Sequence, residues 1–199
     1  MYTKHPYKRD VIGTPEIISQ VTREDIMNYY QTFYSPENMT TIIVGDFDSK
    51  EILEKVEKEF DFKDRQNSPQ KNNEIDNPVT STTIVNNTGN INTSYIMYGW
   101  LGPKACDLKN TICLDLISII FGDGTSSRLY QNLIEKQADP VFNLINCEHY
   151  QFKDGNNFFI QGNFKPEKQE LARKLIEEEL AGLLNKPITE AELQKAKKK

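Results

Sequence analysis

The run from Ile112 to Phe121 constrains the fold more than any other stretch of this sequence. It is apolar apart from Asp115 and Ser118, and it continues a helical pattern that begins at Asp107. A helix that crosses a membrane needs about 20 apolar residues, so this run is too short to span one. Its apolar side chains lie nearly all round the helix, which predicts a helix packed on every side, with Cys113 in the core.

The part of the chain before this helix predicts two more helices with a strand between them. Thr22 and Asp25 have the spacing of a capping box, and Asp48 is expected to cap the second helix. The stretch from Met39 to Phe47 is apolar and β-rich, which predicts a buried strand. Residues 64–79 are polar and show no periodicity, so they are expected to form a linker.

Beyond this linker the pattern predicts strands and helices in alternation. Two strand-like runs at 80–85 and 92–102 flank a turn around Gly89. After the apolar helix we expect a shorter helix, a β-hairpin, a long amphipathic helix, and a helix with a second capping box formed by Thr189 and Glu192. The shorter helix is expected at 127–137, the two strands of the hairpin at 141–152 and 157–164, and the long helix from 166 onward. The order indicates an α+β fold, an antiparallel β-sheet with helices packed on one face.

Charge and the two ends of the chain limit the function classes. The chain of 199 residues has a net charge of −5, which argues against nucleic acid as a partner. The basic run from Lys195 to Lys199 is interpreted as a solvated helix end.

No signal peptide follows Met1, so the protein is expected to be soluble, with cytoplasm and periplasm both open. The short last helix has no stop signal, which indicates a chain cut from a longer one.

The loop "FGDGTSSRLY", residues 121–130, has the composition of a phosphate-binding turn but not its pattern. A P-loop follows a strand and has a lysine after its last glycine, whereas this loop follows a helix and lacks that lysine. We therefore interpret it as a corner between two helices. Gly122 or Gly124 is expected to adopt a positive φ, and Ser126 or Ser127 to cap the next helix.

No catalytic or metal-binding set emerges from the residues themselves. Cys147, Glu148 and His149 are consecutive, but alternation along a strand prevents all three from facing one ion. The only other histidine is His5, and the sequence contains no HxxEH motif and no pair of metal-binding cysteines. The sequence thus predicts no catalytic residue and no metal ligand in this chain.

Three stretches together resemble the pitrilysin/insulinase (M16) family of zinc peptidases, especially its short bacterial processing proteases. Residues 5–48 are similar to the segment that ends the family's N-terminal domain, with "HPY", "VIGT" and "VGDF". Residues 121–136, "FGDGTSSRLYQNLIEK", resemble a G-G-G-x-S-S-R-L segment. Residues 187–197, "PITEAELQKAK", are similar to an I-T-E-E-E-L helix start.

The resemblance implies two similar α+β domains, of which the first binds zinc. The zinc ligands would precede His5, so they are expected in a longer parent protein and not in this chain. On this basis residues 1–63 are the tail of the N-terminal domain, residues 64–79 the linker, and residues 80–199 a second, non-zinc domain that is truncated at its C-terminus.

The resemblance also implies a function for the parent, a zinc endopeptidase that cleaves unfolded peptides. Family members place an arginine and a tyrosine of the second domain at the active site, and those positions fall on Ile134 and Val141 here. Neither can donate a hydrogen bond to an oxyanion. The chain alone is therefore expected to be inactive. It would contribute to the substrate chamber and pair with a related peptidase-like subunit, in a hetero- or homodimer.

Two alternatives stay open at this point. The candidate substrate-binding residues are Gly124, Ser126, Ser127 and Arg128. The resemblance implies that this loop leads into a helix that faces the substrate chamber. Arg128 is interpreted as a structural residue at a helix terminus in preference to a catalytic residue. The loss of both donors also fits a non-catalytic scaffold or interaction subunit of the same family, and no membrane or nucleic acid is expected as a partner of either.

Overall fold

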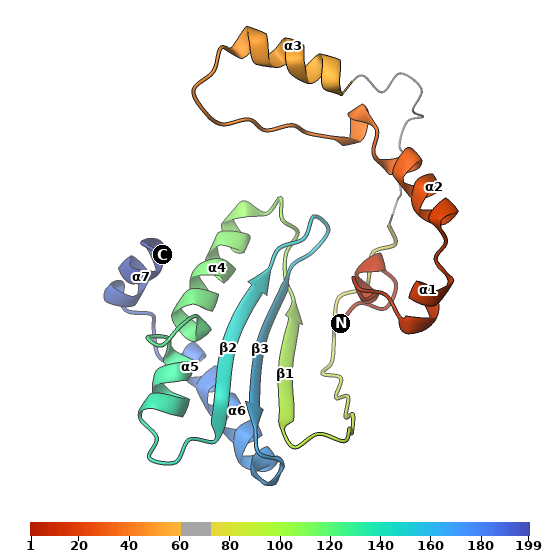
Figure 1. Cartoon of the computed structure of the whole chain (residues 1–199). Helices are drawn as coiled ribbons and strands as arrows, with labels where there is room; N and C mark the ends of the chain where they lie inside the picture. The colour runs from red at the N-terminus through yellow and green to blue at the C-terminus, as the bar shows by residue number, and fades with distance from the viewer. Residues whose placement is uncertain (61–72) are drawn as a thin grey trace. The chain divides into compact units, whose positions relative to one another are not determined.

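The computed structural model describes residues 1–60 and 73–199 (Figure 1). The chain divides into two compact units, one formed by Tyr2–Asn77 and the other by Met1 with Pro78–Lys199. Most of the predicted linker at 64–79, and the boundary placed at residue 63, lie outside the described residues. The domain limits set from the sequence therefore stay predictions.

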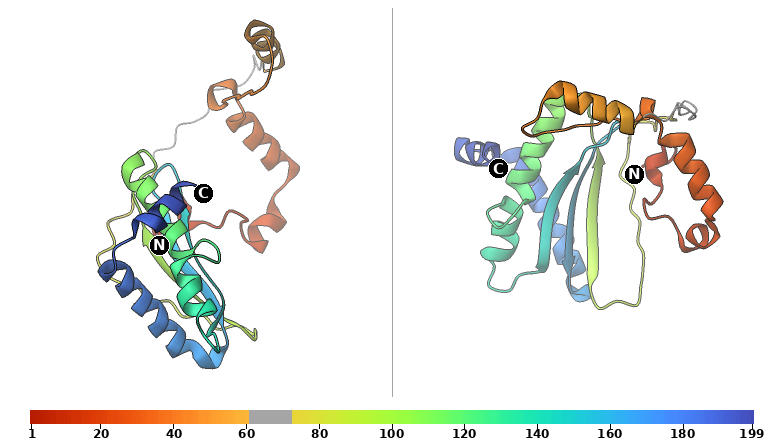
Figure 2. Two further views of the ribbon diagram at one scale, coloured as in Figure 1. Left: turned by 90° about the vertical axis from the view of Figure 1, so that its left-hand side faces the viewer. Right: turned by 45° about the horizontal axis from the view of Figure 1, so that its top comes forward.

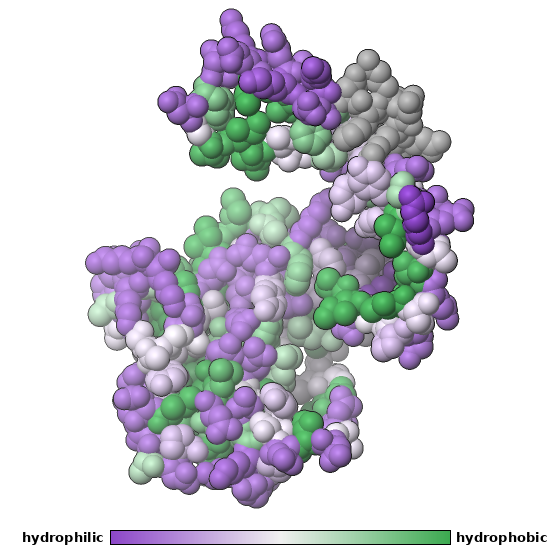
Figure 3. Space-filling model, in the orientation of Figure 1, coloured by the Kyte–Doolittle hydropathy of each residue, from purple (hydrophilic) through white to green (hydrophobic). Residues whose placement is uncertain are grey.

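Helices of the first unit begin where the sequence places their caps. Thr22 and Asp25 form the predicted capping box, and Asp48 Oδ1 accepts hydrogen bonds from the backbone N–H groups of Lys50 and Glu51. The helices of this unit are α1 (Pro15–Gln20), α2 (Arg23–Phe33) and α3 (Ser49–Glu59), with 3-10 turns η1 (Pro6–Lys8) and η2 (Pro36–Asn38). In α3 the hydrophobic residues gather along one side and the hydrophilic residues along the other (Figure 3).

The strand predicted from Met39 to Phe47 is absent from the described first unit. The segment is extended without a ladder, and Ile42 and Val44 are 82% and 93% exposed. A strand is stable only when a neighbouring strand takes up its backbone hydrogen bonds, and no described segment of this unit does so. The residues have strand propensity, but propensity alone does not form a strand.

The second unit is built on an antiparallel sheet with the order β1-β3-β2. Its strands are β1 (Ser94–Leu101), β2 (Phe142–Tyr150) and β3 (Asn157–Phe164), and the predicted hairpin joins β2 to β3. The strand predicted at 80–85 does not form, because residues 79–90 make no ladder with β1 and Ile84 is 67% exposed. The prediction of a hairpin around Gly89 was therefore wrong.

Helices α4 (Leu108–Gly122), α5 (Arg128–Tyr130) and α6 (Gln169–Asn185) lie on one face of this sheet (Figure 2). Between them and the strands is the core, in which Phe121, Leu129, Ile160 and Ile176 are all fully buried. The α+β architecture predicted from the sequence is confirmed. The shorter elements are η3 (Gln131–Glu135), η4 (Pro166–Lys168) and α7 (Glu190–Lys197), and the last of these lies beside α4.

Helix α4 is packed along one side only, not all round as its composition predicts. Leu108 and Ile112 are 66% and 54% exposed, and Cys113 is exposed instead of lying in the core. The sheet, α5 and α7 cover one side of α4, and no other described element contacts the rest strongly. None of the described helices is long and apolar enough to cross a bilayer.

Candidate functional site

The corner between α4 and α5 uses its two glycines for different purposes. Gly124 has a φ of +85°, the left-handed conformation that closes the turn. Gly122 instead lets the helix approach β2, because a Cβ there would lie 2.2 Å from Cys147 Cβ. Of the two alternatives left by the sequence, Gly124 is therefore the glycine with positive φ, and the loop is a helix–helix corner.

The two serines of the corner differ in exposure and in bonding. Ser127 is the N-cap residue of α5, and only 1% of it is exposed. Its hydroxyl donates to the carbonyl of Gly124 at 2.7 Å, and its N–H bonds the same oxygen at 3.1 Å. It therefore closes the turn and does not bond the free N–H groups of the helix. Ser126 is exposed and has its hydroxyl available to a ligand.

Arg128 joins this corner to the start of α7. Its Nε lies 2.7 Å from Glu192 Oε1, and its Nη2 lies 2.9 Å from Glu192 Oε2, so the ion pair is bidentate. The same guanidinium donates to the backbone carbonyls of Lys186 and Pro187 at 3.1 and 3.0 Å. Since all three nitrogens are engaged, Arg128 fixes the α6–α7 turn against α5.

The pKa values of Glu192 and Arg128 both shift toward the charged form of the group. The hydrogen bond from Arg128 is the main cause that lowers the pKa of Glu192 to about 2, and the bonds from Thr189 add to it. The same hydrogen bond raises the pKa of Arg128 above its ordinary value. Both groups stay charged over the physiological range, so neither exchanges a proton in a reaction near neutral pH.

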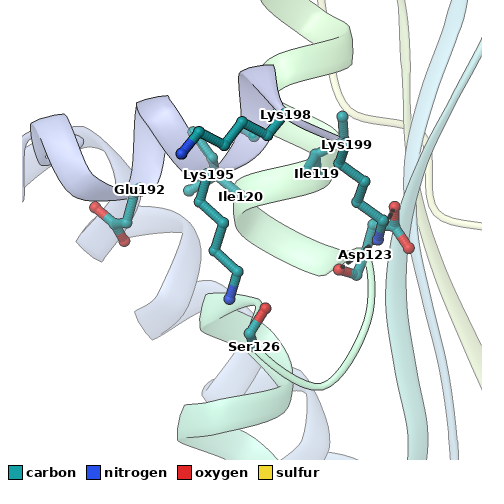
Figure 4. Close-up of a pocket in the computed structure, with 9 residues that line it drawn as sticks. Ile119, Ile120, Asp123, Ser126, Glu192, Lys195, Lys198 and Lys199 are labelled. Carbon is teal, nitrogen blue, oxygen red and sulfur yellow. Dashed lines mark hydrogen bonds and ion pairs between the residues drawn. The ribbon is translucent and has the colours of Figure 1, made fainter.

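Two hollows adjoin the corner. The first has a volume of about 310 Å³ and lies between the end of α4 and α7 (Figure 4). It is lined by Lys195, Lys198 and the exposed Ser126, while Lys199 Nζ lies 2.6 Å from Asp123 Oδ2. The second, of about 520 Å³, lies between α5 and the end of α6, and Arg128 lines it. These groups can hold a polar ligand, but they lack a base beside a nucleophile.

The structure thus brings Ser126, Ser127 and Arg128 together at the hollows, while Gly124 shapes the turn without lining either one. In the described part of the chain, only Ser126 presents an unbonded hydroxyl to both hollows. The role of these four residues in substrate binding stays a prediction.

A polar contact between His149 and Asp115 was not predicted from the sequence. His149 Nδ1 lies 2.7 Å from Asp115 Oδ1, and the imidazole is 1% exposed. Gln151 donates to both oxygens of the same carboxylate, at 2.9 and 2.7 Å. His149 and Cys147 face α4, whereas Glu148 lies on the opposite face of the sheet, as strand alternation predicts. The described residues contain no cluster of three or more potential metal ligands.

Ile134 and Val141 lie in or against the core. Ile134 packs against the buried cluster from η3, and Val141, at 7% exposure, belongs to that cluster. Their side chains are apolar and turned inward, so they can supply no hydrogen-bond donor to a ligand. The π-helical turn of η3 had no signal in the sequence.

Comparison with known proteins identifies the family. Residues 20–199 match the family model described as "Peptidase M16 inactive domain". The chain belongs to the M16 peptidase family. The match covers both the corner and the ion pair of Arg128.

Relatives of this M16 chain are named as zinc proteases. It is 29% identical to the zinc protease PqqE of Helicobacter pylori, over 98% of this chain and 44% of that protein. It is 28% identical to the uncharacterized zinc protease YmfH of Bacillus subtilis, over 100% of this chain and 47% of that protein. The chain therefore spans about half the length of these curated relatives.

Solved structures share the fold. The crystal structure of a protease from Helicobacter pylori superposes with a TM-score of 0.78 at 26% identity, over 98% of this chain and 47% of the other. A peptidase M16 inactive domain from Pseudomonas fluorescens gives a TM-score of 0.80 at 20% identity, over 100% and 47%. The second likeness supports the architecture alone.

Proposed function

We propose that this chain is the non-catalytic part of a zinc-dependent endopeptidase that cleaves unfolded peptides. Zinc would be bound by the part of the parent protein that precedes His5. Residues 80–199 would form one wall of the substrate chamber, and residues 1–63 would complete the zinc-bearing domain. The names of the relatives as zinc proteases support this assignment.

The observation that carries the proposal is the apolar pair Ile134 and Val141 within a chain that matches the inactive domain over residues 20–199. An active centre of this kind needs hydrogen-bond donors beside the oxygen of the peptide carbonyl, and zinc in the parent would supply the activation of water. The chain offers none at these two positions, so chemistry must come from the zinc-bearing part or from a partner subunit.

Within this function the residues of the corner would have two different roles. Arg128 holds α5 and α7 together through Glu192, so it would position the wall of the chamber. Ser126 and the ammonium group of Lys195, at the hollow between α4 and α7, would contact the substrate. This division keeps Ser126 as a substrate-binding residue and gives Arg128 a positioning role.

The test compares the chain with its full-length parent on one unfolded protein substrate, with zinc present and with a chelator added. We expect chelator-sensitive cleavage by the parent and none by the chain. Cleavage by the purified chain that a chelator abolishes would overturn the assignment of a non-catalytic part. If the zinc-loaded parent is inactive, a second measurement with a partner subunit follows.

That measurement adds the relative from the same organism that carries the arginine and the tyrosine. Losing one oxyanion donor typically costs about 100- to 1,000-fold in rate, so a parent that lacks both should be slow by itself. We expect the mixture to be active and the complex to sediment as a dimer. A parent and mixture that are both inactive would favour the scaffold subunit, for which the same apolar pair is the supporting observation.

A further inference from the structure

The hollow between the end of α4 and α7 has an excess of positive charge among its side chains. Its lining contains three lysines and two carboxylates, which are Lys195, Lys198, Lys199, Asp123 and Glu192. Asp123 is paired with Lys199 at 2.6 Å, and Glu192 is paired with Arg128, which lies outside this lining. Among the residues that the structure describes, Lys195 and Lys198 therefore have no acidic partner.

Lys195 and Ser126 reach this hollow from opposite sides. The ammonium group of Lys195 extends from α7 toward the hydroxyl of Ser126 on the corner, and no hydrogen bond joins the two in the described structure (Figure 4). Lys198 follows about one turn later on α7, and its side chain points away from Ser126, so it adds charge at the rim. An ammonium group and a hydroxyl can each donate a hydrogen bond, so both are available to one ligand that offers two acceptor atoms.

The floor of the hollow is apolar. Ile120 and Ala196 are buried, at 6% and 4% exposure, and the partly buried Ile119 lies in the same lining. A ligand with an apolar body would remove the remaining apolar surface from water, which an inorganic anion cannot do. The volume of about 310 Å³ is at the small end of the range for ligand pockets, so the ligand is small.

The second hollow lacks this excess of charge. It is lined by three positive and three negative side chains, namely Arg128, Lys136 and Lys186 with Glu178, Glu179 and Glu192. Arg128 is engaged by Glu192, and Lys136 donates to Asn132 Oδ1 at 3.1 Å. Unpaired positive charge beside an apolar floor therefore distinguishes the hollow between α4 and α7.

We propose that the hollow between α4 and α7 binds an organic carboxylate that has a short apolar body. The two carboxylate oxygens would accept hydrogen bonds from Lys195 and Ser126, and the body would cover Ile119 and Ile120. Two sources share this chemistry, a free organic acid and the C-terminal residue of an apolar peptide. The peptide source rests on the proposed function, because a peptidase releases peptides with new C-terminal carboxylates.

The test titrates the isotope-labelled 199-residue chain with hexanoate and, separately, with hexanamide, and follows the backbone amide signals by NMR. Hexanamide has the same body without the charge. We expect hexanoate to bind at least about five-fold more tightly and to shift the signals of Ser126 and Lys195, because charge-assisted hydrogen bonds are stronger than neutral ones. Acetate, which lacks the apolar body, should bind more weakly than hexanoate.

Variants of α7 locate the site. Lys195→Gln should remove most of the preference for hexanoate, and Lys195→Gln with Lys198→Gln should abolish it. Lys197→Gln is the matched control, because Lys197 is an exposed lysine of the same helix outside the lining of the hollow. Circular dichroism shows whether each variant keeps its helices. Equal affinity for hexanoate and hexanamide, or a preference that survives in the folded double variant, would overturn the proposal.

The two sources are separated with an acetylated Ala-Leu-Leu peptide that has either a free carboxyl end or a C-terminal amide. Binding of hexanoate without binding of the peptide acid would support the carboxylate site and assign it to free organic acids. Tighter binding of the peptide acid than of its amide, lost in the double variant, would support the site and assign it to C-terminal residues.

The cleavage assay of the parent separates this inference from the proposed function. A carboxylate preference at the hollow without zinc-dependent cleavage by parent or mixture would leave the carboxylate site standing and reject the peptidase. Zinc-dependent cleavage by the parent, together with equal affinity of the chain for each acid and its amide, would do the reverse.

Discussion

Arg128 and Glu192 form a bidentate ion pair although they are 64 positions apart in the sequence. The Nε–Oε1 distance is 2.7 Å and the Nη2–Oε2 distance is 2.9 Å. Glu192 also accepts the N–H of Thr189 at 2.8 Å, so one carboxylate serves both as the capping-box residue of α7 and as the partner of α5. The ionised form of Glu192 therefore helps to hold the start of α7 at the corner.

Acid should loosen this contact before it unfolds the rest of the unit. The pKa of Glu192 is about 2 in the folded chain, below its ordinary value of 4.5. A lowered pKa stabilises the fold fully above about pH 4.5, and that contribution is lost as the pH falls toward 2. Thermal melting between pH 7 and 2 should show a steeper fall for wild type than for Glu192→Gln. Glu190→Gln, on the same helix turn, serves as the control, and identical slopes for all three would contradict the prediction.

Gly122→Ala should be among the most damaging small substitutions in the chain. The new Cβ would lie 2.2 Å from both Cβ and N of Cys147, so α4 or β2 must move. We expect a loss of about 3 kcal/mol in unfolding free energy, measured by urea denaturation. Gly182→Ala is the matched control, because nothing lies within 4 Å of its Cβ position and alanine favours a helix by about 0.5–1 kcal/mol. A mild effect at Gly122 would show that the two elements are not in close contact.

The three cysteines should differ sharply in reactivity. Cys106 and Cys113 are exposed, whereas Cys147 is buried and burial raises the pKa of its thiol to about 12. Because the thiolate is the reactive form, a disulfide reagent at pH 8 should modify two thiols rapidly and the third only after denaturation. The absorbance of the chromophore that the reagent releases gives the number of thiols modified. Rapid reaction of all three in the native chain would contradict the burial of Cys147.

Local signals in the sequence were sufficient where the partner residues are close in the chain. The capping boxes at Thr22 and Thr189 form as predicted, because each joins residues three positions apart. The β2–β3 hairpin forms for the same reason. By contrast, the strand propensity of Met39–Phe47 produced no strand, since a ladder depends on a neighbour that the sequence cannot identify. The exposure of Ile112 on α4 likewise depends on which elements pack against the helix, and composition alone does not reveal that.

The candidate site was predictable only in part. Glycine and serine at the corner have a recognisable pattern, and the turn at Gly124 follows from it. Arg128 carries no local sign that Glu192 is its partner, because the contact depends on the return of α6 and α7 to the corner. His149 and Asp115 are on different elements, so their contact became visible only in the packed structure.

Placing the family's two donors into this chain should destabilise it without creating activity. Ile134→Arg with Val141→Tyr restores the residue types by sequence position, yet Ile134 packs against the core and Val141 is 7% exposed. An arginine there loses part of the water around its charged group, and tyrosine exceeds the space that valine leaves. We expect the unfolding free energy to fall by about 3 kcal/mol. Leu184→Arg with Leu108→Tyr, at positions 87% and 66% exposed, should change it by less than about 1 kcal/mol. Urea denaturation measures both pairs, and a peptidase assay with zinc accompanies it. A core pair that is as stable as wild type would mean that both side chains can turn outward, and the two positions would then be available to a substrate after all.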